Sequence, residues 1–210
     1  MIEINSLTKI YRSLKVIDIQ KLEIKSGESI GLIGKNGAGK TTLFRLMLDL
    51  ARPDSGSISI NGEQVTGNEN WKTYVAAYLD ENFLIEYLTP EEYFYFVGSL
   101  QQKPKNEVNQ FLTQFHDFFN NEILNTGKYI RELSKGNKTK IGIAASFLQQ
   151  PEILILDEPF ANIDPSSQFR LIGLLKNLNK KGATLLISSH DLNHVTEISS
   201  RIILMEKGIS

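Results

Sequence analysis

The 210-residue sequence contains no cysteine, which excludes disulfides and thiolate metal sites. It also lacks long apolar runs: one of the longest, at 141–148, falls far short of the roughly 18 residues that a membrane span needs. The N-terminus alternates apolar and polar residues, unlike a secretory signal. The net charge is −1, so no global field draws the chain to nucleic acid or anionic lipid. If this protein works at a membrane, it docks on something already there.

The pattern that is present is an alternation of strands and helices. Buried-strand patterns occur at 29–33, 153–156 and 183–189, and each is followed by a helical pattern. This alternation predicts an α/β fold with a parallel sheet. Earlier in the chain, the Asn61-Gly62 pair predicts a hairpin turn.

The middle of the chain has a different character. Thr89 is a predicted helix N-cap, followed by proline at the first helical position, and Glu92 completes a capping box. Further amphipathic segments follow. We therefore expect one domain over all 210 residues, with a core of 1–81 and 151–210 and a mostly helical insertion over about 82–150.

A complete phosphate-binding motif, G-x-x-x-x-G-K-[ST], runs from Gly34 to Thr41 between a predicted strand and a predicted helix. Its glycines let backbone N–H groups point at phosphate oxygens, and the helix start adds partial positive charge. Lys40 is expected to reach the β- and γ-phosphates and Thr41 to ligate Mg²⁺; a glycine-rich turn without a ligand is the alternative. The residues expected around the phosphates are Asn36, Gly37, Ala38, Gly39, Lys40, Thr41 and Thr42.

Two carboxylates and a histidine are expected at the same edge of the sheet. Asp157 and Glu158 end one buried strand, and His190 ends another. In open α/β sheets, ligands bind at the carboxyl ends of the strands. We expect Asp157 to hold magnesium through a water, Glu158 to be the base that orients the attacking water, and His190 to act at the γ-phosphate. The alternatives are a charged pair that simply reaches solvent and a structural histidine.

Five segments, in this order and spacing, carry a family resemblance: GKNGAGKTT, LSKGN, ILILDEP, ANIDP and SSHDL. Together they resemble the nucleotide-binding domain of an ABC transporter over essentially the whole chain. The resemblance implies a P-loop NTPase with a RecA-like parallel-sheet core, an N-terminal antiparallel β part and an inserted helical subdomain. It also implies a cytoplasmic ATPase that uses ATP and Mg²⁺ and attaches to the membrane through polytopic permease subunits. We expect no nucleic-acid partner.

The LSKGN segment resembles the family's signature motif, usually LSGGQ, which acts on another chain. In the family, two ATP-binding subunits, identical or paralogous, pack head to tail, and each signature closes on the γ-phosphate that the other holds. Ser134, the Gly136 N–H and the following helix suit this anion-binding role; a simple capped helix start is the alternative. Asp164 matches the D-loop aspartate that couples the two sites, and is also a predicted N-cap. Tyr11 matches an aromatic that stacks on adenine, or is a plain edge-strand tyrosine.

Three features depart from the family pattern. Lys135 and Asn137 replace a glycine and the glutamine of the signature; LSKG variants are familiar among ABC-2-type exporters, which favours export. Where the family has its Q-loop glutamine, this sequence has Glu81, or Asp80 if the alignment shifts by one. A carboxylate there would bind the metal more strongly than an amide. The sequence stops soon after the last predicted strand, so we expect no C-terminal regulatory extension of the kind some importers carry.

An aromatic run at 92–100 follows the Q-loop position, where the family has a groove for the membrane subunit. We expect most of these residues in the core, with Tyr87 or Tyr93 lining a groove. The main alternative function is a soluble ABC-type ATPase acting on ribosomes or nucleic acid. The single domain, the absence of sustained heptads and the absence of a basic stripe argue against it. A nucleotide-gated switch without turnover is a third possibility, against which Glu158 argues.

Overall fold

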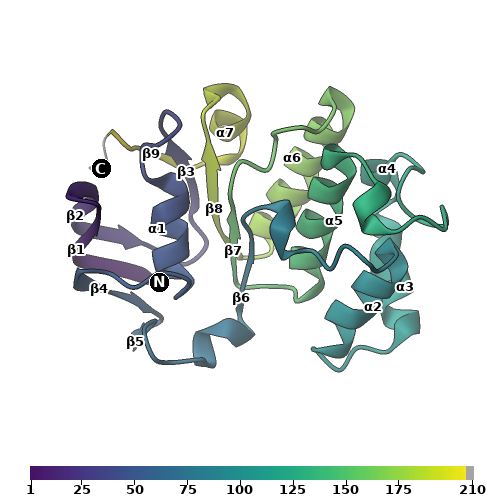
Figure 1. Ribbon diagram of the computed structural model, residues 1–210, viewed down its shortest axis with the longest axis horizontal. Helices are drawn as coiled ribbons and strands as arrows, with labels where there is room; N and C mark the ends of the chain where they lie inside the picture. The colour runs from purple at the N-terminus through teal and green to yellow at the C-terminus, as the bar shows by residue number, and fades with distance from the viewer. Residues whose placement is uncertain (207–210) are drawn as a thin grey trace.

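The computed structural model describes residues 1–206, which form two sheets with helices packed against them (Figure 1). The first sheet is antiparallel and comes from the N-terminal part of the chain. Its strands, in spatial order, are β2 (Leu14–Ile24), β1 (Ile2–Tyr11), β4 (Ser55–Ile60) and β5 (Glu63–Gln64). Asn61 and Gly62 join the last two strands with positive φ at both residues, as the predicted hairpin turn requires.

The second sheet is parallel, as the alternation of strands and helices predicts. Its strands, in spatial order, are β6 (Val75–Tyr78), β7 (Ile153–Leu156), β8 (Thr184–Ser189), β3 (Ser29–Ile33) and β9 (Arg201–Leu204). α6 (Pro165–Lys180) connects β7 to β8 and α7 (Leu192–Ile198) connects β8 to β9, while α1 (Lys40–Met47) follows β3 and leads to β4 of the first sheet. The fold class inferred from the sequence is therefore confirmed.

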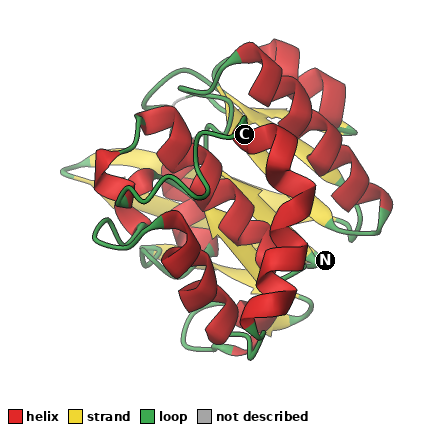
Figure 2. Ribbon diagram, turned by 90° about the vertical axis from the view of Figure 1, so that its right-hand side faces the viewer, coloured by secondary structure: helices red, strands yellow, loops and turns green. Residues whose placement is uncertain are grey.

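The segment between β6 and β7 is mostly helical. In Figure 2, which shows the molecule from the right-hand side of Figure 1, helices lie in front of the strands. They are α2 (Pro90–Ser99), α3 (Lys105–Leu112), α4 (His116–Phe119) and α5 (Lys135–Leu148), with 3₁₀ turns η2 (Glu81–Phe83), η3 (Thr113–Phe115) and η4 (Ile130–Glu132). A further turn, η1 (Asn70–Thr73), precedes β6. The capping box of α2 is present, since Glu92 N donates to Thr89 Oγ1 and Thr89 N donates to Glu92 Oε2. The exact boundaries of core and insertion stay a prediction.

The parallel sheet separates two clusters of buried side chains. One face, with Ile153 and Ile155, packs with α1 and the antiparallel sheet, and the other, with Leu154 and Leu156, packs with α5 and α6. Burial on both faces explains why these strands read as continuous apolar runs. Among residues 1–206, no helix combines the length and the apolar character that crossing a membrane requires.

The order of the strands brings distant segments to one edge. β3, β7 and β8 are parallel, with β8 between the other two. In register, Ile33 lies beside Ser189 and Leu156 beside Ile187. The residues that follow these three strands therefore emerge together, as expected of a ligand site in an open α/β sheet.

Candidate active site

The loop from Gly34 to Thr41 has the backbone shape that its glycines allow. Gly37 and Gly39 have φ of 83° and 103°, in the left-handed region that favours glycine. A Cβ on Gly39 would lie 2.7 Å from the Val16 carbonyl oxygen, so glycine is also required there by close packing. α1 begins directly after Gly39 without a side-chain cap and without an acidic residue in its first turn. Its first N–H groups are thus suited to an anion.

The Lys40 side chain is buried and contacts backbone carbonyls of this loop. Its Nζ donates to the Gly34 carbonyl at 2.6 Å and lies 3.4 Å from the Lys35 carbonyl. The same ammonium lies 3.2 Å from Glu158 Oε1, an oxygen that is buried and accepts no hydrogen bond among the described residues. The loop lysine and the strand-end glutamate thus share one small space, which an incoming phosphate would enter between them.

Asp157 and Thr41 form a pair of hard oxygen donors. The Thr41 hydroxyl donates to Asp157 Oδ2 at 2.5 Å, and the Ser188 hydroxyl donates to Oδ1. Burial raises the pKa of Asp157 above its ordinary value, while the hydrogen bonds from Ser188 and Thr41 oppose that rise. A buried carboxylate beside a hydroxyl is chemistry that suits Mg²⁺, so the residues present fit the ion that the motif implies.

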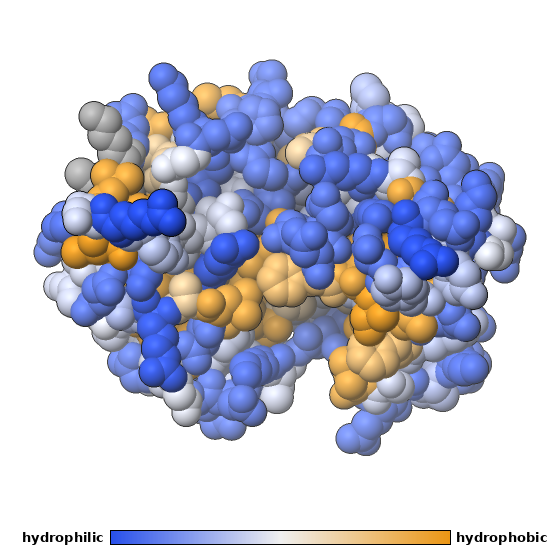
Figure 3. Space-filling view, in the orientation of Figure 1, coloured by the Kyte–Doolittle hydropathy of each residue, from blue (hydrophilic) through white to orange (hydrophobic). Residues whose placement is uncertain are grey.

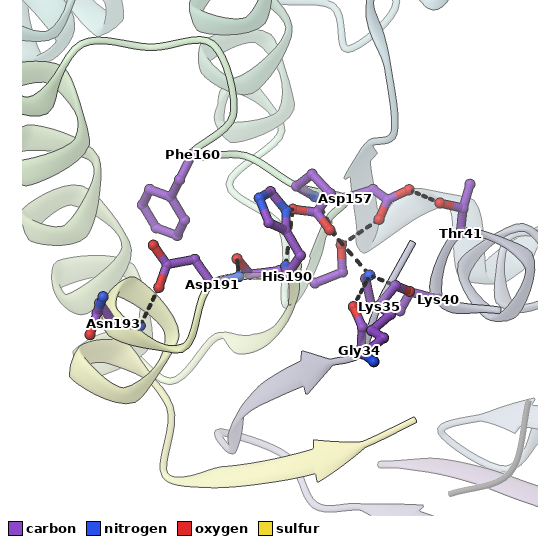
Figure 4. Close-up of polar contacts among 12 residues, drawn as sticks. Gly34, Lys35, Lys40, Thr41, Asp157, Phe160, His190, Asp191 and Asn193 are labelled. Atoms are coloured by element: carbon purple, nitrogen blue, oxygen red, sulfur yellow. Dashed lines mark hydrogen bonds and ion pairs between the residues drawn. The ribbon is translucent and has the colours of Figure 1, made fainter. Parts of the chain in front are cut away.

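Glu158 links three parts of the site. Lys40, Asp157 and His190 lie close together in Figure 4. Glu158 Oε2 lies 2.8 Å from His190 Nδ1 and accepts a 3.3 Å hydrogen bond from His190 N, while Oε1 faces Lys40. Its backbone has φ of 46°, unusual for a residue with a side chain, and its N–H donates to Ser188 Oγ at 2.9 Å. The carboxylate is therefore held between a lysine, a histidine and a serine-anchored backbone.

The ion-pair partner of Glu81 is Lys135, which is not a member of this cluster. Glu81 begins the 3₁₀ turn η2, and its Oε1 lies 3.3 Å from Lys135 Nζ. Asp80, the other candidate for the Q-loop position, caps η2 by accepting from Asn82 N at 2.8 Å. Within residues 1–206, no group of three or more acidic, histidine or cysteine side chains is gathered for a metal. A role for Glu81 at the metal stays a prediction.

Ser134, Gly136 and Asp164 belong to a second cluster, at the start of α5 and α6. Ser134 Oγ accepts from Asn137 N at 3.2 Å, which makes it the N-cap of α5. A Cβ on Gly136 would lie 2.3 Å from the Asn162 carbonyl oxygen, so the signature packs directly on the D-loop of its own chain. Figure 1 shows α5 and α1 on different sides of the parallel strands.

Asp164 is the predicted N-cap of α6, and this is confirmed: Oδ1 accepts from Ser167 N at 2.9 Å. The Ser166 hydroxyl, followed by that of Ser167, holds the pKa of Asp164 well below its usual range. Oδ2 also accepts from Lys140 Nζ at 3.1 Å. The Lys140 side chain is only 2% exposed, and its ion pair with Asp164 joins the signature helix to the D-loop.

Tyr11 is the last residue of β1, at the tip of the β1–β2 hairpin. Tyr11 is 46% exposed, and the Lys9 ammonium lies 5.2 Å from its ring centroid. β1 is an interior strand of its sheet, but its pairing with β4 stops at Thr8, so Tyr11 projects beyond it. The ring is therefore accessible to a base, and its adenine-stacking role stays a prediction.

The chain matches a known protein family. A family model described as ABC transporter matches residues 17–161, more than half of the chain. This protein belongs to the ABC transporter family. The ATP-binding protein YhaQ of Bacillus subtilis, itself uncharacterised, is 34% identical over 99% of this chain. An uncharacterised ABC transporter ATP-binding protein of Nostoc sp. is 33% identical over 97% of it.

Other members of the ABC family are similar at the same level. The sulfate/thiosulfate import ATP-binding protein CysA of Pseudomonas syringae is 31% identical over 99% of this chain. The chain spans 63% of the length of the Nostoc relative, 69% of YhaQ and 65% of CysA. Among solved structures, an ATP-binding subunit of an ABC transporter superposes with a TM-score of 0.87 at 29% identity, covering 100% of this chain and 87% of that one.

A dimeric bacterial ABC cassette, MJ0796, has the same fold, with a TM-score of 0.88 at 22% identity over 100% of this chain and 96% of its own.

Two residues that hold these clusters together are not predicted by the sequence pattern. Ser188 bridges Asp157 and Glu158, and a signal for it existed, since it lies two positions before His190 on a strand predicted to end at this edge. Lys140 gave no signal, because a lysine in an amphipathic helix normally lies at the surface.

Proposed function

We propose that this chain is the ATP-binding and ATP-hydrolysing subunit of an ABC transporter. The observation that carries the proposal is the convergence of Lys40, Thr41, Asp157, Glu158 and His190 at the carboxyl edge of the parallel sheet. These side chains come from three separate segments, yet each lies within hydrogen-bonding or ion-pairing reach of another member. A structural role alone would not need a lysine, two carboxylates and a histidine in one partly buried space.

Each residue has a definite role in this proposal. The N–H groups at the start of α1 and the Lys40 ammonium bind the β- and γ-phosphates. Thr41 and Asp157 would hold Mg²⁺, which supplies positive charge against the phosphates when bound. Glu158 accepts a proton from the attacking water, and His190 keeps the Glu158 carboxylate oriented while its ring faces the γ-phosphate.

The proposal further assigns the signature to a second subunit. Ser134 and Gly136 open a 14-residue helix that has no acidic residue in its first turn, and this helix and α1 lie on different sides of the parallel strands. A helix N-terminus can bind an anion, and this one is not part of the phosphate loop of its own chain. It therefore suits the γ-phosphate bound by another subunit in a head-to-tail dimer. Asp164, held by Lys140 and the α6 start, would then link the two sites across that dimer.

The proposed membrane partner is a polytopic permease that docks beside η2. A hollow of about 140 Å³ there is lined by Leu50, Phe83 and Tyr93, among others. Leu50 and Phe83 are more than half exposed, and Tyr87 is 72% exposed. In Figure 3 hydrophobic colour runs in a band from the end of α1 to α2. Exposed apolar surface of this kind is typical of an interface. The LSKG form of the signature is the basis for proposing export rather than import.

The catalytic assignment is tested with Glu158→Gln. This variant should bind Mg-ATP as tightly as the parent and lose nearly all hydrolysis, since the amide cannot accept the proton. ATP binding by fluorescence titration and phosphate release are the two measurements. Turnover retained within a few-fold of the parent would overturn the role of Glu158.

The transport assignment is tested by co-purification. The chain is tagged at its N-terminus in its native cell, and membranes are solubilised in mild detergent. A polytopic membrane protein recovered at stoichiometric level is the expected result. Recovery only in the soluble fraction, alone or with ribosomes or nucleic acid, would contradict the transport role and favour the soluble ATPase alternative.

A further inference from the structure

The N-terminal half of α5 packs along one stripe onto the end of β6 and the segment that follows it. Thr139 and Gly142 form the buried end of this stripe. The Tyr78 hydroxyl donates to Thr139 Oγ1 at 3.3 Å, and a Cβ on Gly142 would lie 2.3 Å from the Tyr78 ring. This end is fixed by close packing, and burial raises the pKa of Tyr78 to about 12.

The solvent end of the same stripe is made of two ion pairs. Lys138 Nζ lies 2.7 Å from Glu86 Oε1, and Lys135 Nζ lies 3.3 Å from Glu81 Oε1. The Lys135 side chain is 58% exposed and that of Glu81 is 29% exposed. Exposed ion pairs of this kind contribute little and are readily exchanged for another partner. The Lys135–Glu81 pair differs from the Lys138–Glu86 pair in the segments that it joins.

Lys135 and Glu81 both lie in segments where the chain departs from the family pattern. Lys135 lies between Ser134 and Gly136, in the segment that faces a second subunit's γ-phosphate in the proposed dimer. Glu81 is, with Asp80, one of the two candidates for the Q-loop position, whose proposed partner is the metal or water of its own site. In the structure these two charges neutralise each other, so neither is offered to a nucleotide while the pair is intact.

We propose that the Lys135–Glu81 ion pair is a releasable link between the signature and the Q-loop segment of one chain. This inference rests on the proposed function. When the signature closes on the partner's ATP, the γ-phosphate attracts the Lys135 ammonium. Glu81 then loses its partner and becomes available to its own site. Binding of the second subunit's γ-phosphate at the signature of the first subunit thus changes the metal site of the first subunit, because it releases Glu81.

The link makes a prediction that an ordinary stabilising ion pair does not. Neutralising Glu81 frees Lys135 for the incoming phosphate and should strengthen the Mg-ATP dimer. Neutralising Lys135 removes that cation and should weaken the dimer. The two halves of one ion pair therefore act in opposite directions, whereas the loss of a merely structural pair is the same event from either side.

The experiment uses the Glu158→Gln chain, in which bound ATP persists, and measures the dimer dissociation constant with Mg-ATP by sedimentation velocity. Glu81→Gln should lower this constant by about two- to fivefold for each of the two Lys135–Glu81 pairs in a dimer, the range expected for one exposed ion pair. Lys135→Met should raise it by at least as much. Glu86→Gln and Lys138→Met are the matched controls, since they break the neighbouring pair on the same stripe and should leave the constant within about twofold.

The exchanged variant, Glu81→Lys with Lys135→Glu, separates charge from fold. It should melt within a few degrees of the parent yet dimerise more weakly, because a carboxylate now faces the phosphate. Equal or same-direction shifts for Glu81→Gln and Lys135→Met, or shifts no larger than those of the controls, would overturn the link. If the Glu158→Gln parent itself does not dimerise with Mg-ATP, the dimer in the proposed function is wrong and the link falls with it.

Discussion

Replacing Ser188 by alanine should destabilise the chain, and by an amount that depends on pH. The Ser188 hydroxyl donates to the buried Asp157 carboxylate and accepts from Glu158 N at 2.9 Å. A hydrogen bond to a charged group contributes about 1.5–3 kcal/mol, and an unpaired buried N–H costs about 1–3 kcal/mol. Since water entering the vacated space recovers part of this, we expect a loss of about 2–4 kcal/mol at neutral pH.

The pH dependence follows from the pKa of Asp157, which burial raises above 3.8 and the Ser188 hydroxyl lowers. A carboxyl whose folded pKa is raised favours the folded state below its unfolded pKa, and that contribution is lost as pH rises through the folded pKa. Removing Ser188 raises the pKa of Asp157 further. The loss of stability in Ser188→Ala should therefore be clearly larger at pH 7.5 than at pH 4.5.

The assay is urea unfolding without nucleotide and with a metal chelator, followed by the fluorescence of Trp71, which is buried. Ser146→Ala is the matched control. Its hydroxyl is also buried but donates to the neutral Ile143 carbonyl, so its effect should not change with pH. A loss below about 0.5 kcal/mol for Ser188→Ala, or a loss with no more pH dependence than the control, would refute the reasoning.

Two further predictions concern packing and capping. Gly142→Ala should lower the free energy of unfolding by about 1–3 kcal/mol, because its Cβ would lie 2.3 Å from the buried Tyr78 ring. Gly173→Ala has open space around its Cβ and should raise the free energy of unfolding by about 0.5–1 kcal/mol. Thermal melts compare the two variants. Asp164→Ala should lose more than the about 1–2 kcal/mol of an ordinary N-cap at neutral pH, because it also leaves the buried Lys140 ammonium without its carboxylate partner. Because the Ser166 hydroxyl holds the pKa of Asp164 low, its contribution is present above 3.8 and declines only below that pH. Equal melting temperatures for the two glycine variants, or a capping loss already absent at pH 5, would contradict these accounts.

The features predictable from the sequence are those set by local pattern. The loop at Gly34 to Thr41, the strand-end carboxylates and the caps at Thr89 and Asp164 each depend on residues within one short segment. That the strand-end residues meet follows from a general rule, because parallel strands present their carboxyl ends on one side of the sheet.

The contacts that could not be predicted depend on which elements become neighbours. Ser188 reaches Asp157 because β7 and β8 are adjacent, and strand order is not written in any one strand. Lys140 is buried because Asp164 and the Phe118 ring surround its charge, although a lysine in a helix normally stays in water. The Lys135–Glu81 pair likewise joins residues that only the packing of α5 beside η2 brings together.

The central claim is that ATP is hydrolysed at a site shared by two chains, and complementation between inactive variants tests it most directly. Lys40→Ala disables the phosphate loop, and Ser134→Arg blocks the signature, so each variant alone should be inactive. In a head-to-tail dimer, a mixed pair has one intact site, formed by the loop of one chain and the signature of the other. Half of the dimers in an equal mixture are mixed, and one of two sites works in each, so the account predicts recovery of about a quarter of the parental ATPase rate. A mixture as inactive as its components would contradict it.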